Sequence, residues 1–116
     1  MRESIRDPQR LEHIKDACNS LIDFQQSENI FLLNEKDVKY YGLVKLLEII
    51  GEAAYKLTGD FKENHPATPW RQITDMRHIL VHGYYHVNKE DVFKTLQENI
   101  PLLLEEINGY LKEYEN

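Results

Sequence analysis

Apolar residues recur at intervals of three and four along most of this chain, and this spacing is what most restricts its fold. Leu11, Ile14, Cys18 and Leu21 form one such stripe, and the spacing places their side chains on one face of an α-helix. No segment of the sequence alternates between apolar and polar residues for long enough to indicate a β-strand. The pattern therefore predicts an all-α protein.

The first two helices are marked by their ends as well as by their stripes. We expect the first helix to begin at Asp7-Pro8, with Asp7 as its N-cap, and its pattern to fade near residues 27–29. The second helix is predicted from Glu35 to Leu57, with Gly59 ending it. A wide apolar arc predicts that this second helix lies centrally; it comprises Leu43, Leu46, Leu47, Ile49, Ile50, Ala53, Ala54 and Leu57.

The opposite side of the second helix is of mixed character. At about 100° per residue, it gathers Tyr41, Lys45, Glu48, Glu52 and Tyr55. A solvated surface is the simpler interpretation, and a second contact surface stays open because of the tyrosines and Val44.

The second half of the chain predicts one short and two long helices. A helical turn is expected from Asp60 to Asn64, followed by a rigid connection with two prolines at 65–69. The third long helix should run from Trp70 to about His82, with Gly83 as its terminator. The last should run from Asn88, its cap, to Tyr110, with a kink at Pro101. The stripe of this last helix is Val92, Leu96, Ile100, Leu103 and Ile107.

Length and composition favour one domain over residues 1–116, folded as a mostly antiparallel bundle of four to five helices. The net charge of −6 counts against broad electrostatic capture of nucleic acid, so any RNA contact should be local. The single cysteine, Cys18, fits a reducing cytoplasm. The first seven residues lack the apolar region of a signal peptide, and no apolar run approaches the roughly 20 residues that span a bilayer. We therefore expect a soluble cytoplasmic protein with no membrane contact.

The segment from Arg77 to Tyr84 carries the chemistry. An arginine can hold a phosphate through a forked pair of hydrogen bonds, and a histidine can move a proton near neutral pH. Arg77, His78 and His82 together therefore suggest chemistry on a phosphodiester. A plainer interpretation of Arg77 is an internal salt bridge, to Glu48 or Glu52, because it lies beside the apolar face of its helix.

The spacing of these residues leaves the geometry of the site open. His78 and His82 share one helix face, whereas Arg77 and His82 lie about 140° apart around a regular helix. Either the helix ends near His82 and turns that side chain, or a second copy of the chain completes the site. The spacing of His78 and His82 also suits a metal, but with no acidic residue between them and no nearby cysteine we expect none. His13 and His65 are expected to be ordinary surface histidines.

The segment Arg77-x4-His82-x-Tyr84 resembles the Arg-x4-6-His motif of HEPN domains, in the form in which x-Tyr follows the histidine. The segment Leu47-Glu48-Ile49-Ile50-Gly51-Glu52-Ala53-Ala54 resembles the Leu-Glu-x-Ile-Gly-Glu-Ala signature of HepT-like proteins. Further matches are Arg6-Asp7-Pro8, Pro69-Trp70-Arg71-Gln72-Ile73, Met76-Arg77 and Pro101-Leu102-Leu103. The resemblance covers nearly the whole chain, in order and at the right spacing.

This resemblance implies a helical HEPN fold, a homodimer with a shared cleft, and a toxin that cuts RNA. It implies a cognate antitoxin of the MntA type, a small nucleotidyltransferase that silences the toxin by transferring AMP to the motif tyrosine. Carried over, Arg77 and His82 are the catalytic pair, His78 supports them, and Tyr84 accepts AMP. HepT-like chains usually have Asn where this chain has His78, which is within the wider HEPN pattern.

Two hypotheses compete with a ribonuclease. One is a HEPN binding subunit without cleavage activity, which binds nucleotide or positions its nucleotidyltransferase partner. The other is a purely structural dimer in which Arg77 is a salt-bridge residue. For the enzyme we expect cleavage without a metal or other cofactor, because the ribose 2′-OH can serve as the internal nucleophile.

Overall fold

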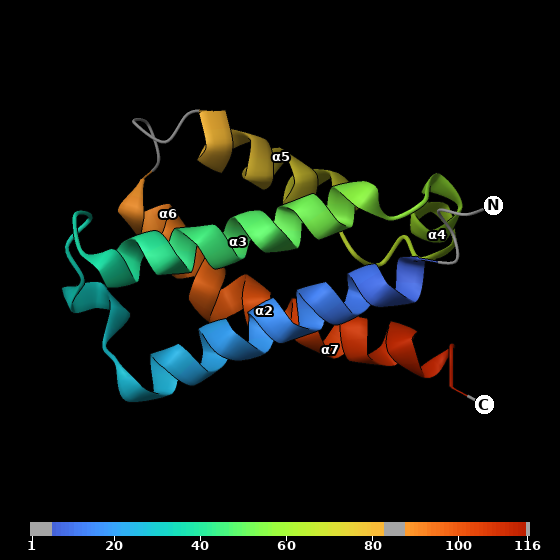
Figure 1. Ribbon diagram of the computed structural model, residues 1–116, viewed down its shortest axis with the longest axis horizontal. Helices are drawn as coiled ribbons and strands as arrows, with labels where there is room; N and C mark the ends of the chain where they lie inside the picture. The colour runs from blue at the N-terminus through green and yellow to red at the C-terminus, as the bar shows by residue number, and fades with distance from the viewer. Residues whose placement is uncertain (1–5, 83–87, 116) are drawn as a thin grey trace.

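The computed structural model describes residues 6–82 and 88–115. These residues fold into helices with short connections (Figure 1). No β-strand occurs in these two ranges, so the predicted all-α class is confirmed. In chain order the elements are α2 (Asp7–Ser27), the 3-10 turn η1 (Ile30–Leu32), α3 (Val38–Lys56), α4 (Gly59–Asn64), α5 (Trp70–His82), α6 (Lys89–Lys94), the π-helical turn η3 (Thr95–Asn99) and α7 (Ile100–Lys112).

Helix α3 lies at the centre, as its wide apolar arc predicts. It packs against α2 and α5, and α2 also packs against α7. Figure 1 shows α2 and α5 on either side of α3, each running antiparallel to it, and α7 running antiparallel to α2. Within the described ranges, no helix combines the length and the apolar character needed to cross a membrane.

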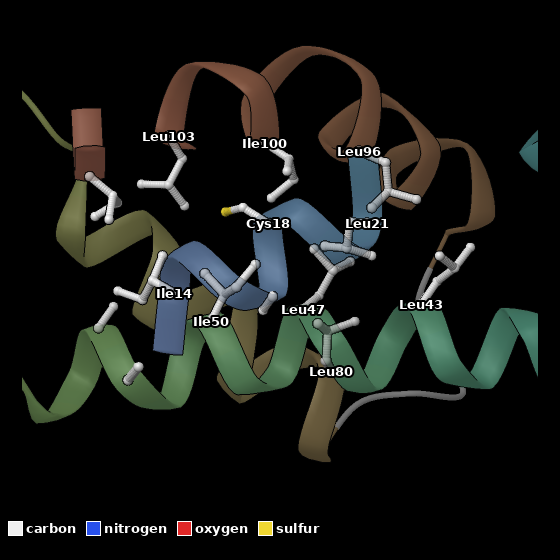
Figure 2. Packing of buried hydrophobic residues seen from close by; sticks show 14 of the residues in the cluster. Ile14, Cys18, Leu21, Leu43, Leu47, Ile50, Leu80, Leu96, Ile100 and Leu103 are labelled. Atoms are coloured by element: carbon white, nitrogen blue, oxygen red, sulfur yellow. The ribbon is translucent and has the colours of Figure 1, made fainter. Parts of the chain in front are cut away.

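The core is built from the predicted stripes. Figure 2 shows Ile14, Cys18 and Leu21 of α2 meeting side chains from α3 and from the last helical segment. The predicted stripes of α2 and of the last segment are buried: Leu11, Ile14, Cys18, Leu21, Val92, Leu96, Ile100, Leu103 and Ile107. Burial raises the pKa of the Cys18 thiol to about 12, so this cysteine acts as a small apolar side chain. The arc predicted on α3 was wrong at Ile49, which is 37% exposed.

The start of α2 differs from the prediction, because Asp7 is not the N-cap. Arg6 occupies that position and makes no side-chain cap, and Asp7 lies inside the helix with 2% exposure. The Asp7 carboxylate accepts hydrogen bonds from the backbone N–H of Thr58 (3.0 Å) and from its hydroxyl (2.7 Å). Asp7 therefore ties the start of α2 to the turn between α3 and α4, a tertiary role that local spacing does not reveal.

The ends of α3 also need correction. The helix begins at Val38 rather than Glu35, because Asp37 caps it by accepting from the backbone N–H of Lys39. Gly59 does not end it: α3 ends at Lys56, and Gly59 is the first residue of α4. Thr58 starts α4 as its N-cap, where its hydroxyl accepts from the N–H of Phe61.

The last helix was predicted to be continuous with a kink at Pro101, and the structure instead divides it into α6, η3 and α7, with η3 ending just before Pro101. Asn88 caps α6 by accepting from the backbone N–H of Glu90, so the predicted cap is confirmed. The turn η3 follows, in which the N–H of Ile100 bonds to the carbonyl of Thr95. Proline lacks an N–H and its ring crowds the preceding turn, so a wider π-helical turn accommodates it. The predicted terminator Gly83 lies outside the described residues.

His65 is not the surface histidine that the sequence suggested. Its ring stacks on Phe61, with centroids 4.0 Å apart, and its side chain is 16% exposed. Nδ1 lies 2.7 Å from the carbonyl oxygen of Phe61, and Nε2 lies 2.9 Å from Oε1 of Glu113. The indole N–H of Trp70 donates to the carbonyl of His65 at 2.9 Å. The histidine thus fastens the connection before α5 to the end of the last helix.

These contacts predict a pH-dependent contribution to stability. Burial lowers the pKa of His65, but the Phe61 carbonyl and the Glu113 carboxylate outweigh it, and the net shift is upward. A folded pKa above the unfolded value, about 6.5, gives stability that is present in full below the unfolded pKa and is lost as the pH rises through the folded pKa. Urea unfolding at several pH values should show His65→Gln losing most stability relative to wild type at low pH. The same loss at every pH would contradict the assignment, and Glu113→Gln should weaken the pH dependence.

Candidate functional site

Arg77 lies on α5, and its guanidinium forms an ion pair through one of its three nitrogens. Its Nε donates to Oε2 of Glu52 on α3 at 2.8 Å, so the predicted salt bridge is confirmed with Glu52 as the partner. This bond does not use the two terminal nitrogens of the guanidinium. A planar guanidinium presents those nitrogens as a fork that suits phosphate oxygens. Glu52 therefore orients the group without occupying the whole of it.

The exposure of this ion pair indicates how much the fold depends on it. The side chains of Arg77 and Glu52 are 32% and 37% exposed. Ion pairs in contact with water contribute about 0–1 kcal/mol, whereas breaking a buried pair costs about 3–5 kcal/mol. The pair belongs to the first class, so its main effect is on the direction of the Arg77 side chain.

Gly51, next to Glu52 on α3, sets how closely α5 approaches. A Cβ placed on Gly51 would run into the Cβ of Arg77, and it would lie 3.0 Å from Cγ and 3.1 Å from Cα of the same residue. Any larger residue at position 51 would push α5 outward. The consecutive Gly51 and Glu52 thus fix both the position and the orientation of Arg77.

A cleft of about 400 Å³ opens beside Arg77. The residues that line it come from three helices: Arg10 and His13 from α2, Lys45, Glu48, Ile49, Glu52, Ala53 and Lys56 from α3, and Arg77 and Val81 from α5. Four of them are lysine or arginine and two are glutamate, whereas the whole chain has 14 basic and 20 acidic residues. The cleft therefore reverses the charge balance of the chain and can attract an anion.

A second, larger hollow of about 850 Å³ adjoins the first and shares Lys45, Glu48 and Val81 with it. Tyr40 and Tyr41 also line it. The two hollows together run along the side of α3 that the sequence left open between solvent and a contact surface.

The remaining predicted site residues are placed only in part. His78 is exposed on α5 and is not among the residues that line the cleft with Arg77. His82 is the last residue of α5, but its side chain, like the whole of Tyr84, lies outside the described part of the structure. The pairing of Arg77 with His82 therefore stays a prediction.

The sequence interpretation missed the contribution of α2. Arg10 and His13 reach the cleft from a helix that lies more than sixty residues before Arg77 in the chain. His13 is exposed, as predicted, but it lies on the cleft rather than on a featureless surface. The only local signal was their position, each one residue before a stripe residue (Leu11 or Ile14) and so at the edge of the buried face.

The described residues include no group of three or more His, Cys, Asp or Glu side chains that could hold a metal ion. The metal-ligand spacing of His78 and His82 includes a side chain, that of His82, outside the described residues.

Comparison with known proteins places the chain among ribonuclease sequences. The profile of the family described as Ribonuclease HepT-like matches residues 14–109. A candidate RNase of Caldanaerobacter subterraneus subsp. tengcongensis is 34% identical over 89% of this chain and 92% of its own length. A candidate ribonuclease HepT of Thermococcus cleftensis is 37% identical over 80% of this chain and 84% of its own length. A candidate RNase of Methanocaldococcus jannaschii is 32% identical over 84% of this chain and 89% of its own length. No solved structure matches the chain significantly.

The role of Gly51 can be tested with a glycine on the same helix as its control. Gly51→Ala should lower the free energy of unfolding by about 1–3 kcal/mol, because the new methyl group overpacks the contact with Arg77. Gly42→Ala should raise it by about 0.5–1 kcal/mol, because Gly42 has no neighbour within 4 Å of an added Cβ and alanine favours a helix. Urea unfolding measures both, and effects of the same sign would contradict the close approach.

Proposed function

This chain belongs to the HepT-like ribonuclease family, and we propose that it is an endoribonuclease that cuts RNA beside Arg77 without a metal ion. The observation that carries the proposal is the setting of Arg77. It is partly exposed, oriented by Glu52, and placed on a cleft with more cations than carboxylates. It also stands five residues before His82 in the motif that resembles the catalytic motif of HEPN domains.

In the proposed reaction, His82 removes the proton from a ribose 2′-OH, and the oxygen attacks the adjacent phosphorus. The bond from phosphorus to the 5′-oxygen breaks, that oxygen takes up a proton, and a 2′,3′-cyclic phosphate is left. Arg77 stabilises the negative charge that develops on the phosphoryl oxygens. His78 orients the phosphate or shares the proton transfers. DNA lacks the 2′-OH and should not be cut.

The proposed enzyme is a homodimer, and the surface around the cleft supports this. Three large apolar side chains that line the cleft or the adjoining hollow are exposed by 37–58%: Tyr41, Ile49 and Val81. Exposed apolar side chains that gather on one surface are typical of interaction sites. Because Arg77 and His82 project about 140° apart on a regular helix, a second copy could set its His82 against the Arg77 of the first.

We further propose that the protein is the toxin of a toxin–antitoxin pair in the cytoplasm, with an MntA-type nucleotidyltransferase as its antitoxin. The antitoxin would transfer AMP to Tyr84, two residues after the end of α5. AMP on this motif residue would add bulk and negative charge that repel the RNA backbone.

A non-catalytic HEPN subunit that binds nucleotide or positions the nucleotidyltransferase is the alternative. The observation that favours it is the excess of acidic over basic residues in the chain, 20 against 14, which weakens non-specific attraction of RNA.

The test is incubation of protein of unmodified intact mass with a structured RNA in EDTA, beside His82→Ala. Wild type should cut the RNA and leave cyclic phosphate ends, and His82→Ala should lose at least about a hundredfold in rate while keeping its fold. A DNA of the same sequence should stay intact. Failure of unmodified wild-type protein to cut RNA would favour the non-catalytic subunit, and a mass gain in multiples of AMP would identify a silenced preparation.

A further inference from the structure

We propose that Arg10 and His13 of α2, with Lys56 of α3, form a subsite for the RNA phosphates that neighbour the phosphate at Arg77. The proposal rests on the function proposed above and assigns its substrate contacts beyond the motif on α5. All three residues line the cleft that Arg77 lines. They act as positioning residues, because none is placed at the reacting atoms.

The cleft is large enough for a short stretch of nucleic-acid backbone. Its volume of about 400 Å³ is within the usual range for ligand sites, about 300–1,000 Å³. Its lining comes from α2, α3 and α5, and α3 packs against both of the other helices. The cations therefore stand on different helices around one hollow, so a strand that lies in it would meet them in succession.

Two of the cations are available to an incoming phosphate despite their ion pairs. Lys56 lies 3.4 Å from Oε1 of Glu52, and Arg77 lies 2.8 Å from Oε2 of the same carboxylate. One carboxylate thus serves two cations and cannot neutralise both. Lys56 is 50% exposed, and exposed pairs of this kind are weak, so Lys56 can exchange Glu52 for a phosphate.

Helix α2 holds its two residues in place from behind. Leu11 and Ile14, the neighbours of Arg10 and His13, are completely buried in the core. Because these neighbours are fixed in the core, the backbone at Arg10 and His13 has little freedom to move away from the cleft. Arg10 is half-buried and His13 is exposed, so both line the cleft on a rigid element.

A nucleic-acid backbone is the anion that best fits several cations spaced around one cleft, because it carries one charge per nucleotide. Contacts to phosphates position a strand without reading its bases. In a chain with a net charge of −6, this local cluster is what lets RNA bind at all. The subsite should therefore raise affinity for RNA of any sequence.

The experiment measures RNA binding and cleavage separately in the full chain. Fluorescence anisotropy follows a labelled single-stranded RNA on a His82→Ala background, which leaves the strand uncut, at several salt concentrations. Arg10→Gln, His13→Gln and Lys56→Gln are compared with Arg71→Gln and Lys94→Gln. These two controls remove the same charges as the arginine and lysine variants, from exposed positions that do not line the cleft. Circular dichroism checks each fold, and the exposed His13 and Lys56 keep the test valid if Arg10→Gln does not fold.

Each cleft variant should raise Kd about 3- to 10-fold, and Arg10→Gln and Lys56→Gln should each reduce the salt dependence by about one counterion. With His82 intact, the same substitutions should raise KM and change kcat less than about twofold. The two control variants should change Kd less than about twofold. Equal effects of cleft and control variants would overturn the subsite.

The two proposals fail in different ways. Wild type that binds RNA through these residues but never cuts it would overturn the ribonuclease and leave the subsite standing. Wild type that cuts RNA with cleft variants indistinguishable from the controls would overturn the subsite alone.

Discussion

The close approach of α3 and α5 at Gly51 is the contact on which the site depends. With no side chain at position 51, the Cβ, Cγ and Cα of Arg77 lie against the backbone of α3. The next residue, Glu52, then reaches the Nε of the same arginine. One glycine and one carboxylate thus turn a residue at the edge of the apolar face into an oriented cation beside a cleft. The Gly-Glu pair in the HepT-like signature has a physical reason here.

The second constraint is electrostatic. An acidic chain that cuts RNA, as proposed here, would have to bind a polyanion, and a local group of basic side chains can do so where the whole chain attracts RNA poorly. Helices α2, α3 and α5 each contribute at least one basic side chain to the same hollow. The proposed chemistry needs little more than this, because RNA supplies its own nucleophile and the protein has to orient, deprotonate and stabilise.

Elements that depend on local spacing could be predicted from the sequence. The stripe of α2, the span of α5 and the cap at Asn88 depend on residues within a few turns, and each is confirmed. The predictions that Asp7 is an N-cap and that His65 is a surface histidine were wrong. The partners of these residues, Thr58 and Glu113, are about fifty residues away in the chain. A capping residue and a surface histidine look the same in sequence whether or not such a partner exists.

The candidate site divides in the same way. The spacing of Arg77 from its apolar neighbours indicated that it needed a partner, and Glu52 was one of two residues named. The contribution of α2 could not be foreseen, because only the packing of α2 on α3 brings Arg10 and His13 to the cleft. The roles of His82 and Tyr84 stay predictions from the motif.

The most direct test of the central claim is a pair of measurements on Arg77→Ala: the rate of RNA cleavage and the free energy of unfolding. If Arg77 is a catalytic cation that Glu52 only orients, cleavage should fall about 10²–10³-fold, while the free energy of unfolding changes by no more than about 1 kcal/mol. A loss of about 3–5 kcal/mol would show that Arg77 is a structural ion-pair residue, and cleavage at the wild-type rate would show that it is not catalytic. Either result would contradict the claim.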